Sequence, residues 1–308
     1  LEIAKTNINL KNIEKVKKDI KIASKFAEKS NVYLEIAKLS HKINNLEQTK
    51  LFLEKSKTAA KSKDQVFWIV RELINIAEFE NSIQENNASN KTLMDAKEYV
   101  LKNLDERIFI EIISSFAKIN NLEQAKELLN LMKPGYEKAM AMSLVGNTFA
   151  NKKDYSVMES FLNEALNTVP DLIGGKYALG LPGFSTKAKI FLYCAKSYAL
   201  AGNFDKAHKI LSQIESDRFY KEGIIDILHL QAKSNMSKTT ELSINILNLG
   251  GKIVDNKFIG NIATILSVSG DIDNSLKTVK RMKFSVALSQ TLINIAQEIN
   301  LQQEDPLI

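Results

Sequence analysis

The stretch Ile43-Asn44-Asn45-Leu46-Glu47-Gln48-Thr49-Lys50 recurs almost unchanged as Ile119-Asn120-Asn121-Leu122-Glu123-Gln124-Ala125-Lys126. The second copy begins 76 residues after the first, which equals two steps of 38. Self-similarity at a period of roughly 20 to 50 residues is typical of repeat proteins, in which each unit buries its apolar face against its neighbours. The sequence therefore predicts an array of repeats.

Apolar residues follow the spacing of an amphipathic helix through most of the chain. Between Ile13 and Phe26, for example, they recur at steps of three and four, which places them on one helix face. Only 12 Gly and 4 Pro occur in 308 residues, and both residues disfavour helix interiors. We therefore expect an all-α protein, with helices over residues 10–29, 31–43, 46–62, 65–83, 90–103, 106–119, 122–132, 136–150, 154–168, 185–201, 204–216, 219–234, 238–249, 256–269, 272–282 and 284–299.

Short turns of one chemical kind separate many of these helices. Each is a pair of small or polar residues followed by Leu, Tyr, Phe or Ile. Gly and Asn tolerate the left-handed conformation that ends a helix, and Asn or Asp can cap the next one. Such turns predict antiparallel helix pairs, and they lie at Asn44-Asn45, Asn120-Asn121, Lys153-Asp154, Gly202-Asn203 and Gly270-Asp271.

A two-helix unit of about 34 residues with this turn resembles the tetratricopeptide repeat. Two further units with the same register begin at Phe109 and Met142, residues 33–56 and 259–282 match more loosely, and the signature Trp of the family is absent. The resemblance implies a right-handed α-α superhelix, or solenoid, of about 7 to 8 antiparallel helix pairs. Its aromatic, small, Tyr, Gly, aromatic, Ala and large apolar positions are matched by Phe191, Ala195, Tyr198, Gly202, Phe204, Ala207 and Leu211.

Two segments interrupt the rhythm. Residues 79–90 are polar and Asn-rich, and we expect a surface loop there. Residues 169–186 hold four of the 12 Gly and two of the 4 Pro, and their Gly174-Gly175-Lys176 lacks the spacing of a phosphate-binding loop. We expect a linker between repeats. With these irregular insertions, residues 1–308 are predicted to form one array.

The first five residues repeat later in the chain. Leu1-Glu2-Ile3-Ala4-Lys5 recurs as Leu34-Glu35-Ile36-Ala37-Lys38. The chain therefore begins inside a repeat unit. We expect it to be part of a longer protein.

The charge of the chain is concentrated at one end. Residues 1–63 contain 15 Lys against 7 Asp and Glu, although the whole chain carries only +6. A basic end attracts nucleic acid, anionic lipid or an acidic protein. An AT-rich coding sequence explains the same excess of Lys, since only four basic residues are Arg, the residue that phosphate recognition favours. Both interpretations stay open.

The sequence offers little for catalysis or metal binding. No apolar stretch reaches the ~18 residues of a membrane span. The single Cys194 fits a reducing cytoplasm, while an exported form whose signal has been removed remains an alternative. None of His41, His208 and His229 is followed three or four residues later by a second His, a Cys or a carboxylate. We therefore expect a protein that is not an enzyme and has no cofactor and no metal.

The resemblance also implies where a partner would bind. In tetratricopeptide-like arrays the first helix of each pair lines a concave groove. Polar side chains at its inner positions could bind an extended peptide, whereas the simpler interpretation makes them solvated surface residues. The predicted binding residues are Asn31, Lys38, His41, Lys42, Arg107, Ser114, Lys118, Ser143, Asn147, Asn151, Lys189 and Lys196.

The favoured function is a non-catalytic scaffold that binds a protein or peptide segment. Helix-pair arrays also bind single-stranded RNA, so an RNA-binding protein is the first alternative. The second is the sensor or docking domain of a larger enzyme or signalling protein.

Overall fold

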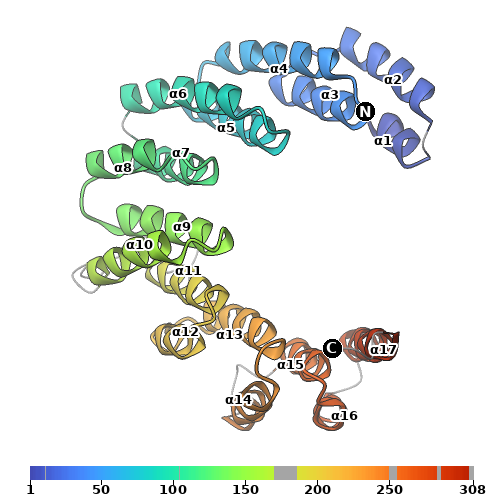
Figure 1. Ribbon diagram of the computed structural model, residues 1–308, viewed down its shortest axis with the longest axis vertical. Helices are drawn as coiled ribbons and strands as arrows, with labels where there is room; N and C mark the ends of the chain where they lie inside the picture. The colour runs from blue at the N-terminus through green and yellow to red at the C-terminus, as the bar shows by residue number, and fades with distance from the viewer. Residues whose placement is uncertain (11, 104, 170–185, 250–254, 283–285, 305–308) are drawn as a thin grey trace. The chain divides into compact units, whose positions relative to one another are not determined.

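The computed structural model describes residues 1–10, 12–103, 105–169, 186–249, 255–282 and 286–304 (Figure 1). Within these ranges the chain forms 17 α-helices and no strand. The predicted all-α class is confirmed. The chain divides into two compact units, which we call unit 1 (Leu1–Ala141) and unit 2 (Met142–Ile308).

Unit 1 consists of short helices joined by tight connections. Its helices are α1 (Glu2–Asn9), α2 (Ile13–Lys25), α3 (Ser30–Lys42), α4 (Leu46–Lys61), α5 (Val66–Ser82), α6 (Asn86–Asn103), α7 (Glu106–Lys118) and α8 (Leu122–Leu131). The next helix, α9 (Tyr136–Asn151), contains the boundary between the units.

Unit 2 continues the same alternation of helices. It contains the rest of α9, then α10 (Tyr155–Thr168), α11 (Thr186–Leu200), α12 (Phe204–Leu211), α13 (Asp217–Ala232), α14 (Met236–Leu249), α15 (Asn256–Val268), α16 (Ile272–Val279) and α17 (Val286–Glu304).

Odd-numbered and even-numbered helices play different parts in both units. In unit 1, α3, α5 and α7 each contact the following even helix, and the contacts α1–α3, α3–α5 and α5–α7 join the odd helices in order. In unit 2, α11, α13 and α15 do the same, with contacts α11–α13, α13–α15 and α15–α17. Each unit therefore has a row of odd helices in mutual contact.

The turns inside helix pairs share one hydrogen-bonded geometry. Asn44 has a φ of 57° and its amide donates to the His41 carbonyl at 2.8 Å, while the Asn45 amide donates to the Ser40 carbonyl at 2.9 Å. These two bonds form the Schellman motif, which satisfies carbonyls at a helix end. The motif recurs, with positive φ, at Gln84, Asn120, Lys153, Gly202 and Gly270.

The residue after each of these positions directly precedes the next helix. The Asn45 side chain accepts a hydrogen bond from the Gln48 amide at 3.1 Å, which satisfies an otherwise unpaired donor. The same cap is made by Asn121, Asp154, Asn203 and Asp271. The five turns predicted from the sequence are therefore confirmed as sharp helix-to-helix turns.

Small buried residues lie at fixed distances from these turns. The Ser89 hydroxyl donates to the Ala77 carbonyl at 2.7 Å, and the Ser275 hydroxyl donates to the Ala263 carbonyl at the same distance. All four residues are fully buried. A buried hydrogen bond between residues twelve positions apart thus joins the two helices of a pair in both units.

Three expectations about the chain's segments need correction or qualification. The predicted helix 10–29 is shorter, since α2 spans Ile13–Lys25, and α1 was not expected. The surface loop expected at 79–90 does not exist, because only residues 83–85 separate α5 from α6. Its Asn-rich part is the first turn of α6, where Ser89 is buried. Of the predicted linker 169–186, residues 170–185 lie outside the described residues.

None of the described helices combines the length and apolar character that a membrane span requires.

Candidate binding surface on the odd helices

Outward-facing positions recur on the odd helices. We count back from the residue just before the following even helix, which is Asn45 for α3. The outward positions lie 14, 10, 7 and 3 residues before it. These spacings keep the four side chains on one helix face. In unit 1 every such residue is exposed or half-buried: Asn31, Glu35, Lys38 and Lys42 on α3, then Arg71, Asn75, Glu78 and Ser82 on α5, then Arg107, Glu111, Ser114 and Lys118 on α7. We call these twelve residues the odd-helix surface.

Most of the residues predicted to bind in unit 1 belong to this surface. Asn31, Lys38 and Lys42 come from α3, and Arg107, Ser114 and Lys118 come from α7. The prediction omitted α5, which contacts both helices. The Gln84-Glu85 turn would have revealed α5 as a repeat unit, but Gln is not a residue expected at positive φ.

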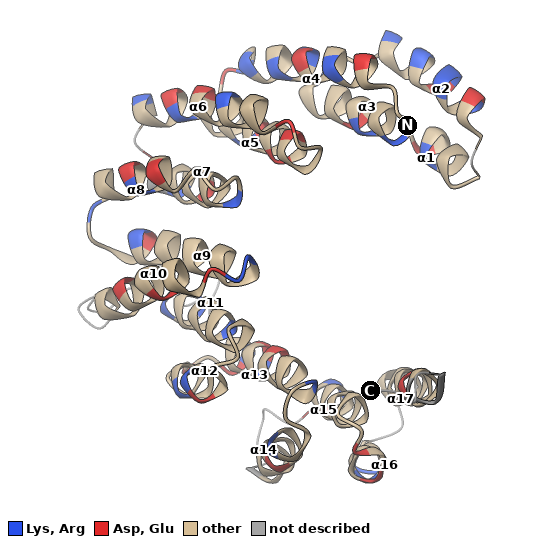
Figure 2. Cartoon of the chain, in the orientation of Figure 1, with Lys and Arg blue, Asp and Glu red and all other residues tan. Residues whose placement is uncertain are grey.

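Ion pairs join the outward residues of neighbouring odd helices. Lys118 pairs with Glu78, and Arg71 Nε lies 4.0 Å from a Glu111 carboxylate oxygen. Two ion pairs therefore connect α5 and α7 on the odd-helix surface, and Figure 2 colours the acidic and basic residues of these helices.

Two of the three remaining basic residues of this surface are paired on their own helix or cap, whereas the exposed Lys42 has no ion-pair partner among the described residues. Lys38 Nζ lies 2.8 Å from Glu35, and Arg107 lies 2.9 Å from Asp105. Burial raises the pKa of Glu35, but the hydrogen bond from Lys38 and the nearby charges outweigh it and lower the pKa. Among the basic residues of this surface, only Lys42 is therefore available as an unpaired cation for an acidic ligand.

Trp68 adds an exposed aromatic side chain one turn before Arg71 on α5. Trp68 is 45% exposed, and Phe67 contacts it edge-to-face with ring centroids 5.1 Å apart. The Arg71 guanidinium lies 5.7 Å from the Phe67 ring centroid. Nearly half of the Trp68 side chain therefore remains open to a ligand.

His41 occupies a different position from its predicted neighbours. Its ring contacts Phe79 edge-to-face at a centroid distance of 6.1 Å, and its buried Nδ1 has no hydrogen-bond partner. His41 is half-buried, so it lies at the edge of the odd-helix surface and contacts α5.

Unit 2 repeats the pattern of bonded outward residues. Asn147 Nδ2 donates to Ser197 Oγ at 3.1 Å, and Asn151 donates to the Asn147 carbonyl at 2.9 Å. Lys196 Nζ lies 2.9 Å from Glu222 and 2.6 Å from Asp226 on α13. Burial lowers the pKa of Lys196, but the two carboxylates raise it overall. The Lys196 ammonium is therefore already paired within the protein.

One predicted residue of unit 2 belongs to the core. Ser143 is fully buried and therefore cannot line an open surface. Ser143 lies 11 residues before the helix cap Asp154. In α3 the buried Leu34 lies 11 residues before the equivalent cap Asn45, so this position of the repeat faces the core. Lys189 is half-buried.

The remaining candidate reactive groups are spread through the described structure. Cys194 is buried, and burial raises the pKa of its thiol to about 12. His208 is half-buried and contacts Gln231, whereas His229 is exposed. Among the described residues, no cluster of three or more His, Cys, Asp or Glu could hold a metal ion.

A comparison with protein-family models found no match, and a comparison with curated proteins found none either. The functional argument therefore depends on this chain's own surfaces.

Proposed function

We propose that the chain is a tetratricopeptide-like solenoid whose odd-helix surface binds an extended protein segment. The observation that carries the proposal is the row of contacting odd helices with outward residues in one register. Such rows form continuous binding surfaces in repeat proteins. The absence of a metal-binding cluster among the described residues is compatible with this function but does not support it.

The contacts of this surface indicate what kind of segment it would bind. Lys38, Lys118 and Arg107 already hold carboxylates, so they offer little charge to a ligand. Asn31 and Asn75 are exposed amides that can both donate and accept hydrogen bonds. A peptide backbone offers matching groups at every residue. We therefore propose that the side-chain amides and Trp68 bind the peptide segment, while the ion pairs connect the helices that carry them.

Aromatic side chains contribute strongly to protein interfaces when they are partly open to a partner. Trp68 stands at the end of the α5 stripe, with Asn75 two turns further along the same face. An extended segment crossing α5 would reach both. Their loss should therefore abolish binding, while the ion pairs keep the helices in place.

A display library of random peptides, selected against the whole chain, tests the proposal. Selected peptides should bind saturably, and the double variant Trp68→Ala/Asn75→Ala should lose that binding. The variant Asn31→Ala/Asn75→Ala removes amides only and controls for a change in packing around Trp68. The matched control is Lys91→Ala/Glu98→Ala, which changes two exposed residues of the even helix α6.

Two results would overturn the proposal. One is that no peptide binds saturably. The other is that selected peptides bind the odd-helix variants and the α6 control equally well. Circular dichroism of every variant establishes that the fold is intact before binding is compared.

RNA binding stays the alternative because of one feature of α2. Its exposed residues Lys15, Lys18, Lys21 and Lys25 have no ion-pair partner among the described residues (Figure 2). Phosphate contacts would make the affinity for single-stranded RNA fall steeply with salt. Binding at low salt that falls in this way, and is lost in a Lys18→Gln/Lys25→Gln variant, would favour RNA over peptide.

A further inference from the structure

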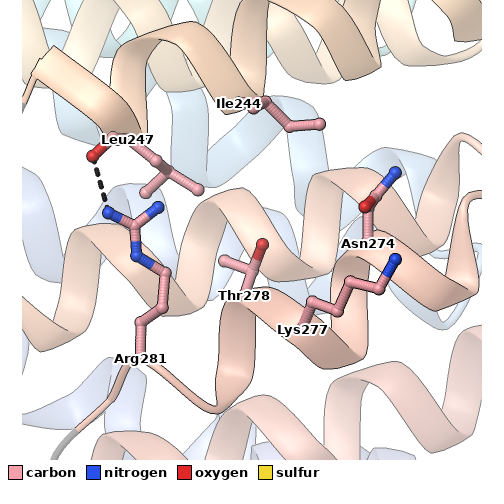
Figure 3. Close-up of a pocket in the computed structure, with 6 residues that line it drawn as sticks. All are labelled: Ile244, Leu247, Asn274, Lys277, Thr278 and Arg281. Carbon is pink, nitrogen blue, oxygen red and sulfur yellow. Dashed lines mark hydrogen bonds between the residues drawn. The ribbon is translucent and has the colours of Figure 1, made fainter.

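A small notch opens between α14 and α16 in unit 2. Its volume is about 140 Å³, and Figure 3 shows its lining side chains. α14 contributes two apolar residues and α16 contributes three polar ones. The fourth polar residue is Arg281, two residues after the end of α16. The lining residues are Ile244, Leu247, Asn274, Lys277, Thr278 and Arg281.

The arginine of the notch is held in place by the protein. Arg281 Nη2 donates to the Leu247 carbonyl at 2.8 Å. This carbonyl belongs to the last turn of α14, where carbonyls lack partners within the helix. The bond fixes one edge of the guanidinium and leaves its other N–H groups available. In Figure 3 the Thr278 hydroxyl and the Lys277 ammonium project from the same side of α16 toward α14.

Four pairs of neighbouring even helices are each joined by a lysine and a carboxylate. Lys61 of α4 lies 2.6 Å from Asp95 of α6, and Lys97 of α6 lies 2.7 Å from Glu127 of α8. In unit 2, Lys206 of α12 pairs with Glu159 of α10, and Lys238 of α14 pairs with Asp205 of α12. Each of these contacts balances a cation with an anion.

The contact between α14 and α16 lacks this balance. Neither Lys277 nor Arg281 has an ion-pair partner among the described residues. Asp271 lies near the start of α16, and its carboxylate accepts hydrogen bonds from the Thr240 hydroxyl and from the Asn274 amide groups. Burial raises the pKa of Asp271, but these hydrogen bonds and the nearby charge of Lys277, which forms no ion pair with it, outweigh burial and lower the pKa. Two cations and a hydroxyl therefore face a notch that contains no carboxylate.

We propose that the notch between α14 and α16 binds the carboxylate of an acidic side chain supplied by a protein partner. The ligand oxygens would take the place that Asp or Glu occupies between the other even helices. Guanidinium and carboxylate groups match in geometry, and the Lys277 ammonium adds a point charge. The aliphatic side chains of Ile244 and Leu247 contact the methylene groups of a glutamate, which makes glutamate the better fit.

The site lies on even helices, so its test does not depend on the odd-helix surface. The probe is glutamate blocked at both backbone ends, which carries a single side-chain carboxylate. The equally blocked glutamine is the uncharged match, and inorganic phosphate is a second oxyanion. Binding is followed in the full chain by the methyl NMR signals of Ile244, Leu247 and Thr278.

Blocked glutamate should shift these three signals saturably at millimolar concentration, and blocked glutamine should not. Lys277→Gln should weaken binding about fivefold, as expected for a partly exposed ion pair. The matched control Lys280→Gln changes an exposed lysine of the same segment that does not line the notch, and binding should be unchanged. Arg281→Lys keeps the charge but loses the planar fork, so it should also weaken binding.

Several results would overturn the proposal. These are saturable shifts with phosphate but not with glutamate, equal shifts with glutamate and glutamine, no shifts at all, or equal weakening by Lys277→Gln and Lys280→Gln. Arg281 also hydrogen-bonds a carbonyl at the end of α14, so Arg281→Lys could weaken binding by destabilising the fold. In that case the result for Lys277→Gln decides, because the Lys277 side chain makes no such bond within the described residues.

Discussion

Unit 1 and unit 2 join their helices by different means. In unit 1 two charged side chains, Glu80 and Lys97, are buried between helices, and no Gly occurs before residue 135. In unit 2 no Asp, Glu, Lys or Arg of the described residues is buried, but glycines lie inside odd helices where a neighbouring side chain comes close. Similar helix pairs can thus be fixed by buried charge or by close approach.

The difference matters because the two means fail in different ways. A buried ion pair is costly to break, since one partner is left charged and unpaired. A glycine contact fails by steric overlap when a methyl group is added. The predictions below exploit this contrast, and Trp68, the single Trp of the chain, gives a fluorescence signal for unit 1 alone.

The largest effect is expected at Glu80 of unit 1. Its carboxylate accepts a hydrogen bond from Thr92 at 2.7 Å and lies 2.8 Å from Lys57 Nζ. Glu80→Ala leaves the buried Thr92 hydroxyl unpaired and leaves Lys57 with only the exposed Glu54 as its ion-pair partner. It should lower the free energy of unfolding by about 2–3 kcal/mol. Urea unfolding followed by Trp68 fluorescence measures the loss.

An apolar replacement of the whole group serves as the control. Lys57→Met/Glu80→Leu/Thr92→Val removes every unpaired polar atom and should unfold within about 1 kcal/mol of the natural chain. If Glu80→Ala alone is as stable as the natural chain, the buried pair does not hold unit 1 together and the comparison fails.

The next largest effect is expected at Gly146 in unit 2. A Cβ there would lie 2.3 Å from Leu162 Cδ2 and 2.7 Å from its Cγ. Gly146→Ala should cost about 1–3 kcal/mol from overlap, reduced by about 1 kcal/mol from the better helix propensity of Ala. Urea unfolding by circular dichroism, with hydrogen exchange of α10, measures the result.

Gly135 provides the matched control for this change. Its Cβ would meet no atom closer than 3.6 Å, so Gly135→Ala should leave the urea midpoint nearly unchanged. Equal effects at Gly135 and Gly146 would show that close approach is not what joins α9 to α10.

Smaller effects are expected at the turns, where the units also differ. Unit 1 places Gln84 at a φ of 66°, whereas unit 2 places Gly202 at 77°. Positive φ costs a residue with a side chain roughly 1–2 kcal/mol, and Gly loses about 0.5–1 kcal/mol more chain entropy on folding. Gly202→Ala should therefore destabilise and Gln84→Gly should stabilise, each by about 1 kcal/mol or less.

Urea midpoints of both variants decide this prediction. Gly202 has open space around its Cβ position, so a loss there reports backbone strain and not overlap. A change of the same sign in both variants would contradict the shared Schellman geometry.

The turns also show how far the sequence alone could predict this fold. Asn44, Asn120, Gly202 and Gly270 are residue types that adopt positive φ readily, so their turns were visible in the sequence. The turn at Gln84 was missed because its residue type gives no such signal. The connection between α5 and α6 was therefore predicted as a loop over residues 79–90, and the outward residues of α5 were missed with it.

The candidate surface was predictable in position but not in charge. Helix periodicity fixes side-chain direction, and Lys38, Lys118 and Lys196 are exposed or half-buried on odd helices; that they bind a partner stays a prediction. Their ion-pair partners were not foreseen. Glu78 lies 40 residues from Lys118, and Glu222 lies 26 residues from Lys196. Pairing between neighbouring repeats requires the spacing of helices in three dimensions, which one sequence does not supply.

The smallest effect concerns the pH dependence of unit 2. His208 is half-buried beside Gln231, and burial lowers the pKa of its imidazole, despite the hydrogen bond to Gln231 and the charge of Asp205. The unfolded chain then takes up the proton first, at a pH near the ordinary value of about 6.5. Stability from neutral His208 is therefore present above that pH and is lost as the pH falls toward the lowered value.

His208→Gln removes this titration and keeps a polar side chain beside Gln231. The urea midpoint of unit 2, followed by circular dichroism after the Trp68 signal of unit 1 is accounted for, should fall from neutral to mildly acidic pH. The fall should be smaller in His208→Gln. Lys238, the other charged neighbour, stays protonated throughout this range, so it cannot produce the difference. Identical pH profiles for the two proteins would place the acid-sensitive group elsewhere and leave glycine contacts as the main determinant of unit 2.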